Sequence, residues 1–169
     1  MSKPPDLVPV SRDGKLQLSF AQQRMWFLYQ LDSSSPFYNG SFQIKIIGAL
    51  NVTVLEQSIN EIIRRHEVLR TTFPTIEGVP FQALAPTLTI TLPVVELQGL
   101  TEASVQQLVA REVRQPFDLV TGPLLRATLL HLSPETHLLI LTMHHIISDD
   151  WSIGIFFKEL GTLYQAFTN

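Results

Sequence analysis

The alternation of apolar and polar positions along the chain first predicts strands. Apolar residues at every second position over 42–46 indicate a strand with one buried face. Apolar runs at 124–132 and 137–143 predict two more strands, and the short polar segment between them predicts an antiparallel hairpin. Further strand-like segments cover 79–84 and 88–95.

Apolar residues at helical spacing predict four helices. They cover 23–31, Asn51 or Thr53 to about Arg65 or His66, 101–114, and about 152–167. Ser19 with Gln22 and Thr53 with Glu56 have the capping-box spacing, and Asp150 or Ser152 is predicted to cap the last helix. Helices interleaved with strands, at least one hairpin among them, predict an α+β fold in which a mixed sheet packs against helices.

Composition limits the classes of protein to consider. The chain has 169 residues, 45% of them hydrophobic and 16% charged, with a net charge of -3, which is typical of one globular domain without a nucleic-acid or anionic-membrane partner. No apolar run approaches the roughly 20 residues that span a bilayer, and the first residues are too polar for a signal peptide. The absence of cysteine excludes disulfides and thiolate chemistry, and a cytoplasmic location fits. Residues 1–17, with three prolines, indicate an N-terminal linker or a strand leading into the domain, and 18–169 the folded domain.

The segment from His144 to Asp150 concentrates titratable groups directly after the most apolar predicted strand. An unperturbed histidine titrates near pH 6.5 and can accept a proton near neutrality. Adjacent histidines leave a strand in opposite directions, so we expect one of His144 and His145 to face the core and the other a cavity. Asp149 lies four residues after His145 and could organise the loop. Taken singly, however, either histidine is more often a hydrogen-bonded structural residue.

Other chemistries have less support in the sequence. A metal site at His144, His145 and Asp149 lacks a helical His-Glu-x-x-His pattern and a distant ligand, so we expect no metal. No Gly-x-Ser-x-Gly elbow, phosphate-binding loop or dinucleotide fingerprint occurs. The arginines at 64–70 could interact favourably with the negative end of the helix dipole, or one of them could pair with Asp149. His66, His131 and His137 have no clustered partners in the sequence and are assigned to structure or surface.

Four ordered segments together resemble one known family. His144-His145-x-x-x-Asp149 resembles the HHxxxDG motif of nonribosomal peptide synthetase condensation domains. Residues 19–26, 65–73 and 116–126 resemble other segments of that family, in the same order. The resemblance runs from about Leu16 to the end of the chain.

The resemblance implies a fold like that of chloramphenicol acetyltransferase, with two similar subdomains facing each other across a tunnel. The chain corresponds to the N-terminal subdomain, and the C-terminal subdomain is absent, so the isolated fragment is expected to be inactive. Members of the family are acyltransferases of secondary-metabolite biosynthesis. Upstream and downstream carrier proteins present thioesters on 4'-phosphopantetheine arms, and the downstream amine attacks the upstream thioester to form a peptide bond. The resemblance therefore implies that no cofactor is bound directly.

The resemblance also implies residue roles. His145 would accept a proton from the attacking amine or orient it, and His144 would be structural. Asp149 would pair with Arg65, or with Arg70 as second candidate, to hold the loop. The family pattern looks most like domains that take an L-configured donor (LCL type).

One position departs from the family motif, because Asp150 stands where the family has glycine. An extra anion would favour protonated histidine and make His145 a poorer base. Alternatively, Asp150 points away and caps the last helix, which is the preferred interpretation. Alternative functions are a non-catalytic module that binds a carrier protein or another partner, and a related epimerising or ester-forming acyltransferase. An apolar surface left exposed by the missing half predicts self-association.

Overall fold

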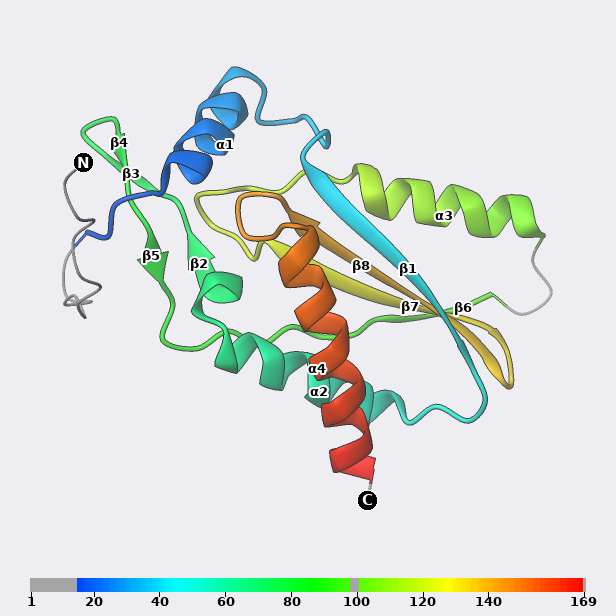
Figure 1. Ribbon diagram of the computed structural model, residues 1–169. Helices are drawn as coiled ribbons and strands as arrows, with labels where there is room; N and C mark the ends of the chain where they lie inside the picture. Colours follow the sequence, from blue (N-terminus) through cyan, green and yellow to red (C-terminus); the bar gives the residue numbers. More distant parts are fainter. Residues whose placement is uncertain (1–14, 98–100, 169) are drawn as a thin grey trace, which may run out of the picture.

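The computed structural model describes residues 15–97 and 101–168 (Figure 1). The helices are α1 (Phe20–Leu31), α2 (Val52–Arg65), α3 (Glu102–Arg114) and α4 (Asp150–Thr168), with a 3₁₀ helix, η1 (Glu67–Arg70), after α2. The long strands are β1 (Asn39–Ile47), β7 (Leu125–Ser133) and β8 (Thr136–His144). The short strands are β2 (Thr71–Thr72), β3 (Thr75–Ile76), β4 (Val79–Pro80), β5 (Ala83–Leu84) and β6 (Val94–Glu96).

A mixed four-stranded sheet with the order β1-β8-β7-β6 forms the centre of the fold. Strand β8 pairs antiparallel with both β1 and β7, and β6 runs parallel to β7. The predicted hairpin is therefore confirmed as β7–β8. The α+β fold class, a mixed sheet packed against helices, is confirmed as well.

Helices cover both faces of this sheet, which explains the continuous apolar run of β8. Leu139, Leu141 and Met143 point into a core shared with α2 and α4. Leu138 and Ile140 contact a second, smaller cluster that includes α3. Because side chains alternate along a strand, a strand buried on both faces needs apolar residues at nearly every position. Figure 1 shows α4 and α2 lying across one face of the sheet.

At the first three helices, the starts follow the sequence signals with one change. Ser19 and Gln22 form the predicted capping box at the start of α1, and Thr101 caps α3. At α2 the cap is Asn51, whose side chain accepts from the Val54 N–H, so the alternative start at Thr53 is wrong. The helix ends at Arg65, with His66 as its C-cap, as predicted.

The predicted strands at 79–84 and 88–95 are only partly present. The first is divided into β4 and β5, and residues 88–93 lie outside any strand. Side chains of α2 take the backbone groups there: Asn60 bonds both the N–H and the carbonyl of Ile90, and Glu56 accepts from the Leu92 N–H at 2.7 Å. An extended segment whose backbone is satisfied by a helix does not need a strand partner.

Residues 1–14 of the predicted N-terminal linker lie outside the described residues. Within the described part of that linker, Leu16 forms an isolated antiparallel bridge with Gln82. No helix among the described residues is long and apolar enough to cross a membrane.

Candidate functional site at the end of β8

Two neighbouring segments hold the backbone where β8 ends. The His144 N–H donates to the carbonyl of Leu124 at 3.0 Å, on the β7 side. The His145 N–H donates to the carbonyl of Tyr38 at 2.9 Å, on the β1 side. His144 is the last residue of β8 and His145 follows it, and the backbone N–H of each is held by a neighbouring segment.

His144 faces the interior and is 4% exposed. Its Nδ1 accepts from the Ile146 N–H at 3.0 Å. The ring meets the edge of Phe117, with centroids 6.3 Å apart, and tilts against Tyr38 at 6.4 Å. Burial, and secondarily the charge of His145, lowers the pKa of His144 to about 4. His144 is thus a neutral hydrogen-bond acceptor that shapes the loop at physiological pH.

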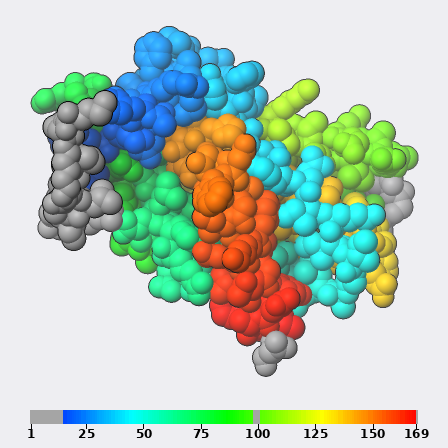
Figure 2. Space-filling view, viewed as in Figure 1, coloured from blue at the N-terminus to red at the C-terminus, as the bar shows by residue number. Residues whose placement is uncertain are grey.

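His145 faces the other way and is exposed. Its Nδ1 lies 3.4 Å from the Ser148 carbonyl oxygen, while the Ile147 N–H and the Ser148 hydroxyl both donate to the His144 carbonyl. Figure 2 shows the segment with this loop and the first turns of α4 (orange) at the surface, below α1 (blue). The predicted opposite orientation of the two rings is confirmed.

An apolar cavity of about 90 Å³ lies beside the loop, but His145 does not line it. Its walls come from α2, η1, the end of β8 and α4, with Met143, Ile147 and Ser148 contributed by β8 and the loop. The expectation that one histidine faces a cavity therefore does not hold for this cavity. His145 instead opens onto the surface of the described chain.

Asp149 caps α4, which corrects the prediction that Asp150 or Ser152 does so. An Asp149 carboxylate oxygen accepts from the Ser152 N–H at 2.8 Å, and the Ser152 hydroxyl accepts from the Asp149 N–H at 2.8 Å. This reciprocal pair lowers the pKa of Asp149. Asp150 is the exposed first residue of the helix, where a carboxylate favours the helix dipole. The preferred interpretation of this departure from the family motif is therefore wrong about the cap, which is Asp149, while Asp150 lies exposed in the first turn of the helix.

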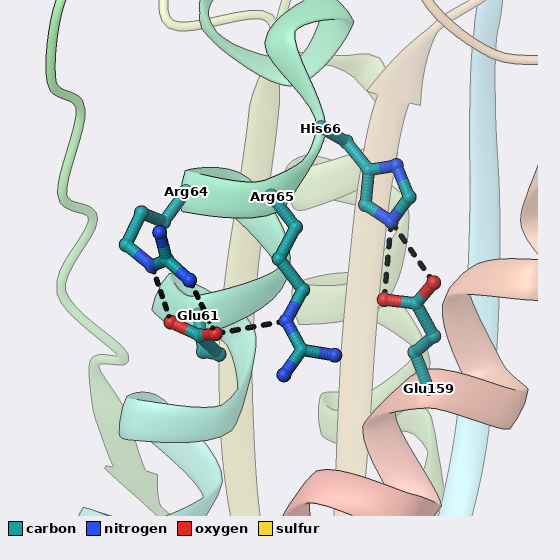
Figure 3. Close-up of polar contacts among 5 residues, drawn as sticks. All are labelled: Glu61, Arg64, Arg65, His66 and Glu159. Atoms are coloured by element: carbon teal, nitrogen blue, oxygen red, sulfur yellow. Dashed lines mark hydrogen bonds and ion pairs between the residues drawn. The ribbon is translucent and has the colours of Figure 1, made fainter.

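The arginines make other partners than the predicted one (Figure 3). Arg65 Nε lies 2.8 Å from Glu61 Oε1, and Arg64 Nε lies 2.7 Å from Glu61 Oε2. Their hydrogen bonds lower the pKa of Glu61 to about 2. Arg70 donates to the Ala85 carbonyl at 2.6 Å. The expected pair of Asp149 with Arg65 or Arg70 is therefore not formed in the part of the chain that the structure describes.

The pair of Asp149 with Arg65 is missing because each residue has a partner close to it in the chain. Glu61 and Arg65 are four residues apart on α2, so they meet without any tertiary contact, and Asp149 is exposed and engaged by the start of α4. Figure 3 also shows a partner for His66 that the sequence did not indicate. Its Nε2 lies 3.0 Å from a carboxylate oxygen of Glu159, which joins the end of α2 to α4.

Two residues beside His144 were not predicted as part of the site. Phe117 belongs to the segment 116–126 that carries the family resemblance, so its presence there was a usable signal. Tyr38 follows a polar turn and carried no such signal. Among the described residues, no group of three or more His, Asp or Glu side chains could hold a metal ion.

A family model and known proteins match this chain over most of its length. A family model described as the condensation domain matches residues 12–169. A linear gramicidin synthase protein of Brevibacillus parabrevis is 44% identical over 164 residues, which cover 95% of this chain and 2% of that protein. Phosphinothricin tripeptide synthetase PhsC of Streptomyces viridochromogenes is 42% identical over 158 residues, 91% of this chain and 14% of that protein.

Solved structures agree with the sequence relatives. The first condensation domain of the CDA synthetase superimposes with a TM-score of 0.84 at 26% identity, over 92% of this chain and 41% of that one. The X-domain from teicoplanin biosynthesis, solved in complex with OxyB, superimposes with a TM-score of 0.88 at 30% identity, over 96% of this chain and 35% of that one. The chain therefore spans less than half the length of each of these relatives.

Proposed function

Because this chain belongs to the condensation domain family, we propose that it supplies the histidine-bearing part of an acyltransferase that forms amide bonds. The substrates are an acyl thioester on one carrier protein and an amine on a second, both tethered through 4'-phosphopantetheine. The remaining contacts come from a second, C-terminal subdomain that faces the exposed side of the loop. The pattern of residues 19–26 and 65–73 favours an L-configured donor.

The observation that carries this proposal is the division of labour between the two histidines. His145 is exposed on backbone held from both sides, and His144 beneath it is buried and neutral. In the proposed step, the amine nitrogen attacks the thioester carbon, the C–N bond forms and the C–S bond breaks. His145 either accepts the proton that the amine nitrogen loses or orients the amine for attack, and that proton ends on the departing sulfur, which leaves as the thiol.

Substituting the exposed histidine tests the proposal. In the synthetase that carries this chain, His145→Ala is expected to lower the single-turnover rate of amide formation by about 100-fold or more, as removal of an acid–base group does. His131→Ala is the matched control, because His131 lies at the other end of β7 and is expected to leave the rate unchanged. Equal rates for wild type and His145→Ala, with both carriers loaded, would overturn the proposal.

A second candidate is a domain that recruits a partner protein without forming a bond. The X-domain of known structure was solved bound to OxyB and is 30% identical to this chain, and Asp150 replaces the family's glycine. Under this alternative His145→Ala leaves product formation unchanged, and deletion of the domain abolishes binding of the partner. The same experiment therefore separates the two candidates.

A further inference from the structure

The carbonyl groups at the C-terminal end of α3 receive side chains from two different strands. The last carbonyls of a helix have no partner within the helix and must be satisfied from outside. Asn39, the first residue of β1, donates from Nδ2 to the Val113 and Gln115 carbonyls, at 2.9 Å each. Because both acceptors are carbonyl oxygens, only the amide nitrogen of Asn39 can face them.

Arg126 of β7 reaches the same end of α3. Its guanidinium donates to the carbonyls of Gln115 at 2.6 Å, Pro116 at 3.2 Å and Glu112 at 3.4 Å. Its Cζ also lies 3.7 Å from the centroid of the Phe117 ring, a cation–π contact. The Gln115 carbonyl is thus shared by Asn39 and Arg126, and we call the carbonyls of Val113, Gln115 and Pro116 the α3 carbonyl cluster.

Each side chain bound to the α3 carbonyl cluster connects to the histidine loop by a short route. Asn39 pairs with His144 in the β1–β8 register, and its neighbour Tyr38 accepts the His145 N–H. Arg126 stacks on Phe117, whose ring is perpendicular to that of His144 with centroids 6.3 Å apart. The route through Asn39 and Tyr38 fixes the backbone of His145. The route through Arg126 fixes the Phe117 ring, which packs against His144.

We propose that Asn39 and Arg126 are positioning residues for His145, acting through the α3 carbonyl cluster. Neither contacts the reacting atoms. Asn39 holds the segment that accepts the His145 N–H, and Arg126 holds Phe117 against His144. The catalytic part of this inference rests on the proposed function of His145, whereas the geometric part concerns the loop alone.

Asn39→Asp in the synthetase that carries this chain is the first test. The substitution keeps the shape and replaces both donors by acceptors that face carbonyl oxygens. We expect kcat for amide formation to fall about tenfold or more with KM for the loaded carriers changed less than about twofold, because small misplacement of a catalytic group lowers the rate steeply. Hydrogen exchange of peptides covering 143–148, followed by mass spectrometry, is expected to accelerate.

Asn60→Asp is the matched control. Asn60 also bridges a helix to an extended segment through its amide, with Nδ2 bonded to the Ile90 carbonyl at 2.9 Å and to the Glu56 carbonyl at 3.1 Å. Its loss is expected to lower the melting temperature while leaving kcat and the exchange of 143–148 unchanged. If the two variants lower kcat equally at equal loss of stability, the role of Asn39 is only structural and the proposal is wrong.

Arg126 variants keep the test decisive if Asn39→Asp does not fold. Lysine retains the charge but lacks the planar fork that reaches several carbonyls and stacks on a ring, so Arg126→Lys is expected to have a kcat between those of wild type and Arg126→Met. Lowered kcat without faster exchange of 143–148 would overturn the positioning role. Faster exchange in these variants, together with normal kcat in His145→Ala, would instead support the positioning and overturn the proposed function.

Discussion

The β7–β8 hairpin has a pair of histidines at each end, and the two pairs behave in opposite ways. At the open end, His144 and His145 are consecutive, yet one is buried and the other exposed. At the turn, His131 and His137 are six residues apart, yet they are cross-strand partners whose rings stack with centroids 4.8 Å apart and planes within 7°. Adjacency in the chain separates two strand residues, whereas strand register brings distant ones together.

The surroundings of the two pairs differ as well. His131 Nδ1 lies 2.7 Å from a carboxylate oxygen of Glu96, which is 67% exposed. Burial and the charge of His131 lower the pKa of His137, while Glu96 raises it. No carboxylate is among the causes that shift the pKa of His144, where burial dominates. A carboxylate therefore partly offsets the lowering of the histidine pKa in the pair at the turn, His131 and His137. In the pair at the open end, His144 lies in the core and His145 at the surface.

The largest expected effect is the acid sensitivity caused by His144. Its pKa is 6.5 ordinarily and about 4 in the folded protein, so between these values the unfolded state binds more protons. Stability from this group is full above pH 6.5 and falls as pH decreases toward 4, by at most about 3 kcal/mol, since each pKa unit corresponds to roughly 1.4 kcal/mol. Urea denaturation at several pH values between 4 and 7 measures the slope.

His144→Asn is the control for that slope. The asparagine Oδ1 can take the place of Nδ1 as acceptor for the Ile146 N–H, and the side chain does not titrate. The variant is expected to be less stable than wild type at pH 7, because the ring contacts are lost, but to show a shallower decline toward pH 4. An identical decline in both proteins would contradict the assignment of acid sensitivity to His144.

Local sequence rules predicted much of the frame that positions the loop. The Ser19 capping box, the β7–β8 hairpin and the opposite orientation of His144 and His145 all depend on residues close together in the chain or on strand periodicity. The stacking of His131 on His137 required the register across a turn, which the apolar pattern alone did not provide.

The wrong predictions arose where a side chain or backbone group has a different polar partner from the one predicted. Arg65 binds Glu61 one helical turn away, and Asp149 binds Ser152, so the pair implied by family resemblance is not formed. Residues 88–93 contain strand-forming side chains, but Asn60 and Glu56 of α2 satisfy their backbone. Both outcomes depend on which polar groups are nearest in space, and periodicity does not carry that information.

A smaller effect is expected at the cap that holds the loop to α4. Asp149→Ala removes the acceptor for the Ser152 N–H and should lower the free energy of unfolding by about 1 kcal/mol, as loss of an N-cap does. Asp149→Asn keeps an acceptor of the same shape and should be close to wild type. Thermal melting of both variants decides between the cap and an ion pair: if Asn destabilises as much as Ala, the charge of Asp149 matters and an arginine partner must be sought.

The smallest effect is expected at the turn pair, where the anion is mostly exposed. In the wild type, the Glu96 carboxylate lies beside His131 and raises the pKa of His137. Glu96→Gln removes this carboxylate, so the pKa of His137 should fall further below its ordinary value. A lower folded pKa means that stability is lost as pH decreases, so the variant should match wild type at pH 8 and be less stable at pH 5. Because Glu96 is 67% exposed, solvent screens the pair and the difference should be about 0.5 kcal/mol or less. Urea denaturation at the two pH values measures it, and a deficit of equal size at both would show that Glu96 contributes packing rather than charge, which would remove the electrostatic contrast between the two ends of the hairpin.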